Sequence, residues 1–310
     1  MVVRKILPTE RDFHILEFLW RWKLVTSSAL IARFFPDKEI HTAYRRLWTL
    51  RRAGYTTLVS LAGERRFAWA LTSKGFQLLL PLLPAMKDVG FKAEAPDHDF
   101  IASAVHLGGW LNSIPPAAGL FSEQELRRLD PEHYPAWVPR TQLRRPDGYW
   151  RVPMGNAAVT IALEVELSRK KASHYEILAD FYESQESIYR VVWVVKTQDQ
   201  IRNIAAAMRR RIQSRALLHC FLWLSDYLDT GWNTTFRAGY ERGRTLGALL
   251  FNCPTTPPQH VVGHRLLDTR IMPRESVVCA AGSQSLGRYR PGYSPSRPVL
   301  PTSAIEKESL

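Results

Sequence analysis

Cysteines are few in this sequence of 310 residues, and long apolar runs are absent from it. The three cysteines, Cys220, Cys253 and Cys279, are widely separated and show no CxxC spacing. This spacing argues against a disulfide framework and a zinc ribbon, and it is typical of a chain that works in a reducing cytoplasm. No apolar run approaches the roughly 20 residues that span a bilayer, so we expect no membrane partner.

Acidic residues are scarce relative to basic ones. The chain has 42 Lys and Arg against 29 Asp and Glu, which gives a formal net charge of +13. Residues 1–90 hold 15 of the basic residues and only 7 of the acidic ones. The first part of the chain therefore carries most of the excess charge, and an excess of this kind favours a polyanionic partner such as DNA.

Glycine-rich phosphate loops are also missing. The segment GRTLGALL, residues 243–250, lacks the Gly-Lys-Ser/Thr ending of a nucleotide-binding loop. We find no other cofactor-binding motif in the sequence, so we expect no organic cofactor.

The first 95 residues have the pattern of three helices followed by a hairpin. Thr9 and Thr26 are suitable caps for two short amphipathic helices, and residues 37–55 predict a third. Residues 56–72 are typical of two strands around a turn at Gly63. This order predicts a winged helix-turn-helix DNA-binding domain over residues 1–95, in which the third helix contacts the major groove.

The third helix has two unlike faces. Helical spacing places these apolar residues on one face: Ile40, Ala43, Tyr44, Leu47 and Leu50. The other face is polar and, together with the tip of the hairpin, supplies the predicted DNA contacts: Thr42, Arg45, Arg46, Thr49, Arg52, Arg65 and Arg66. The alternative is that these arginines only solvate an exposed face.

Residues 96–252 alternate between strand and helix patterns. After a helical pattern over residues 95–111, the order from residue 145 is strand, strand, helix, strand, helix, strand. This alternation predicts an α/β domain over residues 96–252. Residues 226–252 are ambiguous, and the proline-rich residues 253–310 are expected to form a flexible tail.

An acidic strand lies within PDGYWRVPMGNAAVTIALEVELSRKK, residues 146–171. Strand alternation puts Glu164 and Glu166 on one side of this apolar strand. Two neighbouring carboxylates repel each other unless a divalent cation such as Mg²⁺ or Mn²⁺ is bound between them, and Asp147 could supply a further oxygen. The alternative is an edge strand whose polar face meets solvent.

These residues carry a resemblance to a known family. Pro146-Asp147, followed 17 residues later by Glu164-Val165-Glu166, is similar to the signature of the PD-(D/E)xK nuclease superfamily. Together with the winged-helix pattern, residues 9–213 resemble the replication-relaxation family, which includes bacterial relaxases that mobilise plasmids and integrative elements. The resemblance implies a restriction-endonuclease-like mixed sheet flanked by helices, and metal-dependent cleavage or nicking of plasmid or mobile-element DNA.

The resemblance also implies a role for each site residue. Asp147, Glu164 and the Val165 carbonyl would be the Mg²⁺ or Mn²⁺ ligands. Glu166 stands where the family commonly has lysine, so it would be a further ligand or the base that orients water. Lys170 or Lys171 would then stabilise the charge on the phosphate.

The departure at Glu166 keeps a second function open. The chain could be a non-catalytic replication accessory or a transcriptional regulator with a degenerate nuclease fold. The expected partner is DNA, as a duplex or in nicked or single-stranded form. A second copy of the chain and relaxosome proteins are left open as further partners.

Other candidate residues are weaker. None of the nine histidines form an H-x-H pair, so the tyrosine chemistry of conventional relaxases is unsupported, and Tyr149 is interpreted as a core or stacking residue. His98 and Asp99 either contact the metal site or cap a helix. The arginine-rich residues 209–215 either contact the DNA backbone or neutralise a helix C-terminus.

Overall fold

The protein is described by a computed structural model. Every described residue lies within Met1–Asp268. The described ranges are 7–61, 66–111, 119–140, 145–211 and 218–251. Arg65 and the predicted tail, residues 253–310, lie outside these ranges, and the predicted boundary at residue 95 stays a prediction.

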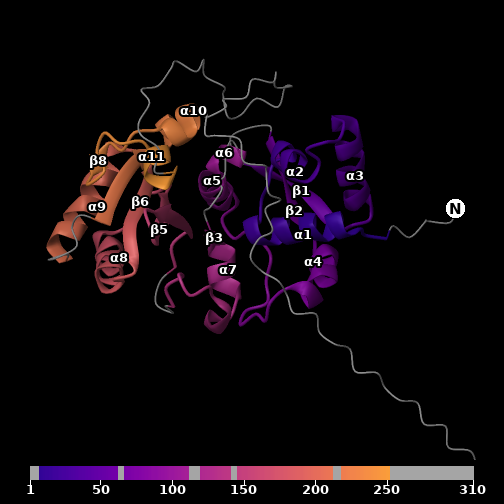
Figure 1. Cartoon of the computed structure of the whole chain (residues 1–310), viewed down its shortest axis with the longest axis horizontal. Coiled ribbons are helices and arrows are strands. Elements are labelled where there is room, and N and C mark those ends of the chain that lie inside the picture. The colour runs from indigo at the N-terminus through magenta and orange to yellow at the C-terminus, as the bar shows by residue number, and fades with distance from the viewer. Residues whose placement is uncertain (1–6, 62–65, 112–118, 141–144, 212–217, 252–310) are drawn as a thin grey trace, which may run out of the picture. The chain divides into compact units, whose positions relative to one another are not determined.

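The N-terminal elements are three helices, a two-stranded antiparallel sheet and a fourth helix (Figure 1). Their bounds are α1 Glu10–Trp22, α2 Ser27–Phe34, α3 Ile40–Arg52, β1 Thr56–Leu61, β2 Arg66–Leu71 and α4 Ser73–Leu79. The predicted caps begin the first two helices. The backbone N–H of Thr9 donates to Asp12 at 2.6 Å, and the Thr26 hydroxyl accepts from the N–H of Ala29 at 3.2 Å.

Helix α3 buries fewer residues than its sequence pattern suggests. Ala43, Leu47 and Leu50 are buried, but Ile40 and Tyr44, which were expected on the apolar face, are exposed. Trp48 is also exposed. The buried stripe is therefore narrower than the predicted apolar face, and the residues at its edge remain in contact with solvent.

The rest of the described structure is built around a six-stranded mixed sheet with the strand order β3-β4-β5-β6-β7-β8. The strands are β3 Gly119–Ser122, β4 Gly148–Met154, β5 Ala157–Glu166, β6 Ile188–Val195, β7 His219–Trp223 and β8 Ala238–Gly239. Strands β5, β6 and β7 are parallel, and the other neighbours are antiparallel. The predicted mixed sheet with flanking helices is thus confirmed.

Helices cover both faces of this sheet. They are α5 Pro96–His106, α6 Gly108–Leu111, α7 Glu123–Arg128, α8 Ala172–Ser184, α9 Gln198–Arg211, α10 Leu224–Thr230 and α11 Leu246–Phe251. On one face, Ala162 and Trp193 belong to the same hydrophobic cluster as buried residues of α8 and α9, two helices that lie side by side in Figure 1. On the other face, Ile161 and Leu163 pack with residues of α5, α10 and α11.

Strand β5 therefore lies in the interior of the sheet, with helices over both of its faces. The alternative of an edge strand with a solvent-facing polar side is wrong, because β4 and β6 pair with its two edges. The alternation predicted for this strand is confirmed, since Ile161 and Leu163 share one cluster while Ala162 lies in the other.

Three local features depart from the sequence pattern. Strand β3 was not expected, and it adds a third antiparallel strand beside β4. The helix expected over residues 95–111 ends at His106 and resumes as α6, because Gly108 adopts φ +76° and interrupts the helical backbone. The ambiguous residues 226–252 form α10, β8 and α11. None of the helices in the described ranges is long and apolar enough to span a membrane.

Candidate functional site

The turn before β4 fixes Asp147 against β5. The backbone N–H of Asp147 donates to the Leu163 carbonyl at 2.9 Å, and Asp147 Oδ2 accepts from the N–H of Val165 at 2.6 Å. Gly148 allows this turn to approach α5 closely, since a Cβ atom at position 148 would lie 2.2 Å from Cε1 of the buried His106. The structure therefore brings Asp147 to the carboxyl end of β5.

Glu164 is half-buried on β5 and interacts with helix α8. The Tyr182 hydroxyl donates to Glu164 Oε1 at 2.5 Å. Burial and the charge of Asp147 raise the pKa of Glu164 to about 8, although the Tyr182 hydrogen bond and the nearby Lys170 act in the opposite direction. The surroundings of Glu164 therefore disfavour the ionised form of its carboxyl group.

Glu166 is buried and paired with a lysine. Lys170 Nζ lies 3.0 Å from Glu166 Oε2, and the N–H of Ser168 donates to Glu166 Oε1 at 3.4 Å. Burial lowers the pKa of Lys170, but the carboxylates of Glu166, Glu164 and Asp147 raise it overall. Lys171 is exposed and occupies the N-cap position of α8. Of the two candidate lysines, Lys170 is the one that lies against the acids.

His98 contacts the same end of β5 from α5. Its Nε2 atom lies 2.9 Å from the Val165 carbonyl oxygen and 3.6 Å from Asp147 Oδ2. Burial lowers the pKa of His98, but its interactions with Asp147 and Asp99 outweigh burial and raise the pKa to about 11. Asp99 in turn pairs with Lys23 at 3.2 Å. The His98 ring, whose protonated form is favoured by these surroundings, thus lies against two of the oxygen groups expected to bind a metal ion.

The three acids do not form a shared metal site as they stand. Within the described ranges, no group of three or more His, Cys, Asp and Glu side chains is arranged to hold a metal ion. Glu166 is paired with Lys170, from the loop that leads into α8, and His98 lies at Asp147. The chemistry of Asp147, Glu164 and the Val165 carbonyl still fits a hard cation, because all three offer oxygen ligands.

Two tyrosines of α8 were missed by sequence reasoning. Tyr182 binds Glu164, and the Tyr175 hydroxyl accepts from the N–H of Lys170 at 3.1 Å. Their spacing of seven residues puts both on one face of α8, directly after the acidic strand, and this is the signal that could have identified them. Tyr149 is fully buried, and burial followed by the charge of Glu164 raises its pKa far above the ordinary value. It therefore does not offer an accessible nucleophile.

The predicted DNA contacts on α3 differ in their surroundings. Thr42, Arg45 and Arg52 are exposed, and the half-buried Thr49 donates its hydroxyl to the Arg45 carbonyl at 2.7 Å. The side chain of Arg66, at the start of β2, is outside the described part of the chain, as is all of Arg65.

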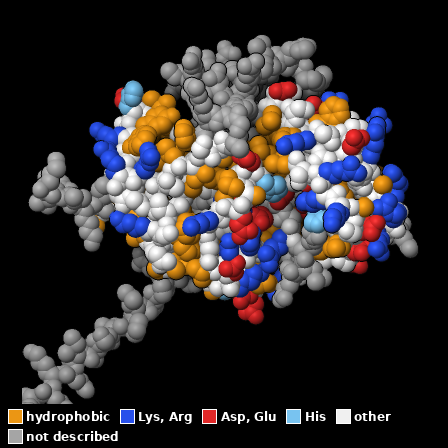
Figure 2. Space-filling view, turned by 180° about the vertical axis from the view of Figure 1, so that it is seen from behind, with side chains coloured by type: hydrophobic (Ala, Val, Ile, Leu, Met, Phe, Trp, Pro, Cys, Tyr) orange, Lys and Arg blue, Asp and Glu red, His pale blue; other side chains and the backbone are white. Residues whose placement is uncertain are grey.

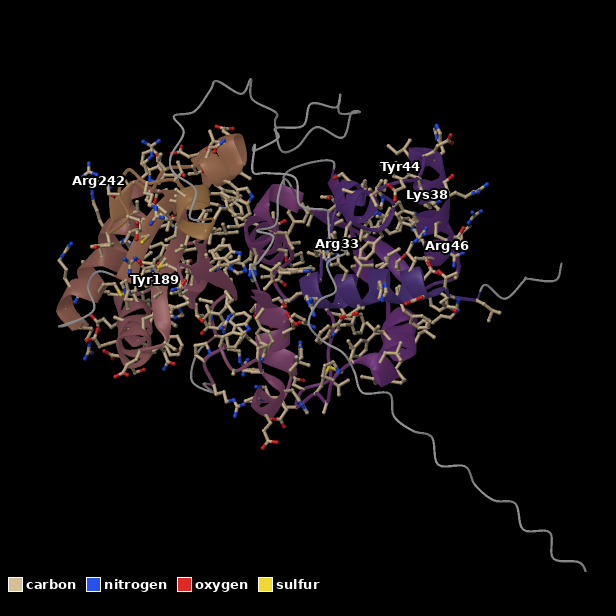
Figure 3. The ribbon with its side chains drawn as sticks, viewed as in Figure 1. Arg33, Lys38, Tyr44, Arg46, Tyr189 and Arg242 are labelled. Carbon is tan, nitrogen blue, oxygen red and sulfur yellow. The ribbon has the colours of Figure 1, made fainter. Side chains whose placement is uncertain are left out.

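Arg46 is engaged inside the protein. Its Nε atom donates to Oδ1 of the fully buried Asp12 at 2.9 Å, and its Nη2 atom pairs with Oδ2. Burial raises the pKa of Asp12, but hydrogen bonds from Arg46 and Thr9 outweigh burial and lower it. In Figure 3, Tyr44 and Arg46 project from different sides of α3. Arg46 therefore links α3 to α1 through its ion pair with Asp12.

The arginines that end α9 are also partly paired. Arg210 Nη2 lies 2.9 Å from Glu176 of α8, and Arg211 lies 3.7 Å from the same carboxylate. These ion pairs connect the two helices on one face of the sheet. Of the other two arginines in this stretch, Arg209 is exposed on α9, and Arg215 lies outside the described residues.

Comparison with known proteins adds little. No protein family and no curated protein matches the chain. Among solved structures, the chain is similar to the restriction endonuclease FokI bound to DNA, with 9% sequence identity and a TM-score of 0.23. The match covers 70% of this chain and 43% of the FokI chain. A likeness this loose does not establish a shared fold or activity.

Proposed function

We propose that the protein binds DNA through an N-terminal winged helix, residues 1–95, and cuts one strand with a metal-dependent site in a nuclease-like domain, residues 96–252. One observation carries the catalytic part: Asp147, Glu164 and Glu166 meet at the carboxyl end of β5, where Lys170 Nζ lies 3.0 Å from Glu166 and Asp147 accepts from the N–H of Val165 at 2.6 Å. Three carboxylates and a cationic amine are the groups that metal-dependent phosphodiester cleavage uses. The targets proposed by resemblance are plasmid and mobile-element DNA.

Asp147, Glu164 and the Val165 carbonyl would hold Mg²⁺ or Mn²⁺. When bound, such an ion lowers the pKa of water and neutralises charge on a phosphate. Glu164 must lose its proton to become a ligand, and the imidazolium of His98 must move away from Asp147. Lys170 is positioned to stabilise negative charge on the phosphate, which gives it the role left open by the glutamate at position 166.

The proposal is tested by nicking of supercoiled plasmid with Mg²⁺ or Mn²⁺. Glu164→Gln preserves the size of the side chain but removes a carboxylate, so it should lower the nicking rate by about a hundredfold or more. Lys170→Met should have a comparable effect, whereas Lys171→Met should have little. Asp199→Asn, at an exposed site on α9, serves as the control.

Nicking that survives Glu164→Gln would remove the proposed site. Nicking that proceeds equally in excess chelator would remove the metal. Duplex binding should be largely unchanged in both Glu164→Gln and Lys170→Met, because the DNA contacts are proposed to lie on α3.

A second function is favoured by the pairing of Glu166 with Lys170 and of Asp147 with His98. If these ion pairs persist, the protein is a non-catalytic DNA-binding protein, such as a replication accessory or a transcriptional regulator. DNA binding without metal-dependent nicking in the wild-type protein would select this function.

A further inference from the structure

Helix α3 carries a row of exposed apolar side chains, which we call the aromatic row: Ile40, Tyr44 and Trp48. These residues are 49%, 38% and 42% exposed. A spacing of four residues stacks them along one side of the helix. Exposed apolar side chains that occur singly need no explanation, but a continuous row with two aromatic rings marks a surface that meets a partner.

Trp48 is held in place by its neighbours. Its ring meets that of the buried Trp69 edge to face, with centroids 6.0 Å apart and planes at 80°. The guanidinium group of Arg51 lies 4.6 Å from the centroid of the Trp48 ring. The indole is therefore oriented before any partner binds, which lowers the entropy cost of stacking against it.

The charges around the aromatic row select the partner. From Ile40 to Arg52 the helix contains no acidic residue and four arginines, of which Arg46 is paired with Asp12. Arg45 and Arg52 are exposed, one helical turn or less from Trp48 along the chain. Figure 2 shows Lys and Arg side chains bordering hydrophobic ones on the flank where α2 and α3 lie. A second copy of this face would bring arginine against arginine, so self-association through it is disfavoured.

We propose that α3 binds DNA in which some bases are unpaired, with those bases stacked on Trp48 and Tyr44 and the flanking phosphates bound by Arg45 and Arg52. This inference rests on the proposed role of α3 in DNA binding and narrows its substrate. An intact duplex presents only base edges and methyl groups in its grooves, because the flat faces of the bases are hidden in the stack. Aromatic rings interleaved with arginines fit a strand whose bases are accessible.

The experiment compares three labelled DNAs by fluorescence anisotropy: an intact duplex, the same duplex with a single-stranded gap, and the exposed strand alone. Wild-type protein should bind the gapped duplex more tightly than the intact one. Trp48→Ala should weaken binding to the gapped duplex about tenfold but binding to the intact duplex less than about twofold. Ile177→Ala, at an exposed apolar site on α8, is the matched control and should change neither.

Two further variants protect the test against misfolding. Tyr44→Ala should weaken binding to gapped DNA in the same selective way, and circular dichroism checks that its fold is kept. Trp48→Phe retains an aromatic face and should keep most of the preference for gapped DNA. Equal losses on gapped and intact DNA in Trp48→Ala and Tyr44→Ala would overturn the inference, as would no loss on either.

The outcomes separate this inference from the proposed function. If Arg45→Ala weakens binding to all three DNAs while the aromatic variants change nothing, α3 binds DNA but not through stacked bases. If wild-type protein binds none of the DNAs, both proposals fall. A wild-type dimer that Trp48→Ala converts to a monomer, with unchanged binding to gapped DNA, would assign the aromatic row to a second copy and overturn the inference.

Discussion

The exposed face of α3 and the carboxyl end of β5 are both rich in charge, but they use it differently. On α3, Arg45 and Arg52 extend into solvent. At β5, Glu166 is buried against Lys170, and the carboxylate of Asp147 accepts a backbone hydrogen bond. The cationic face is open to an external polyanion, whereas the carboxylates of the acidic site already have partners inside the protein, Lys170 and His98.

The two regions differ in the rearrangement that each requires before it can bind its proposed partner. The α3 face requires no rearrangement, so its contribution to binding should follow salt concentration as any surface charge does. The β5 site requires its internal cations to be displaced, since His98 lies where a metal ligand set would form. Binding at α3 and chemistry at β5 are therefore expected to respond to different perturbations.

Metal binding provides the largest expected difference between the two regions. At about one hundred times its dissociation constant, Mg²⁺ or Mn²⁺ should raise the free energy of unfolding by about 2.7 kcal/mol, because it binds only the folded protein. Glu164→Gln should abolish this rise, and Arg45→Ala should leave it intact. Thermal or urea unfolding with and without metal measures it. An equal rise in Glu164→Gln would place the metal elsewhere.

The next largest effect is expected on the free energy of unfolding when Arg46 is replaced. This arginine lies on α3, but it is paired with a buried carboxylate, as Lys170 is at the end of β5. Arg46→Ala leaves the fully buried Asp12 without its main partner, and should lower the free energy of unfolding by about 2 kcal/mol. Arg45→Ala, one residue away, should change it by less than about 0.5 kcal/mol. Urea denaturation distinguishes them, and equal effects would mean that the ion pair adds nothing.

The salt dependence of DNA binding should also distinguish variants of α3 from variants of the β5 site. Each arginine that binds a phosphate contributes about −0.9 to the slope of log K against log salt concentration. Arg45→Ala should therefore flatten the slope by about one unit, while Glu164→Gln should leave it unchanged. A slope that is unaffected by Arg45→Ala and by Arg52→Ala would show that α3 does not contact the DNA backbone.

The smallest effect is a pH dependence of stability. The pKa of Asp12 is lowered in the folded protein, so its pairing with Arg46 contributes stability above the ordinary aspartate pKa of about 4. This contribution is lost as the pH falls through the lowered pKa. The difference in unfolding free energy between wild type and Arg46→Ala should therefore narrow below about pH 4. A difference that is constant down to the acid-unfolding transition would contradict this.

Local patterns predicted much of the fold. The alternation of β5 predicted which residues share a face, and the capping residues Thr9 and Thr26 marked where α1 and α2 begin. Strand β3 was not predicted, because a strand of four residues is too short to show a clear alternation of apolar and polar positions. Its place is set by pairing with β4, a contact between distant parts of the chain.

The site was harder to predict, because its residues are defined by partners that lie far away in the sequence. The sequence pattern places both Arg45 and Arg46 on the polar face of the third helix. Asp12, 34 residues before Arg46, nevertheless pairs with Arg46 alone. In the same way, His98 reaches the Val165 carbonyl from 67 residues away. Spacing along the chain selects residues of the right type, but only the packing of α1 and α5 decides which of them are free.

Gly148 makes the position of the Asp147 carboxylate sensitive to a substitution at the neighbouring residue. Any side chain there would collide with the ring of the buried His106, so a substitution at this position should displace either that ring or the turn that holds Asp147. In the second case, the aspartate would still be present in the sequence after its carboxylate had left the strand. The acidic residues of the proposed site could thus all remain in the sequence while Asp147 no longer meets β5, so Gly148 belongs in any description of that site.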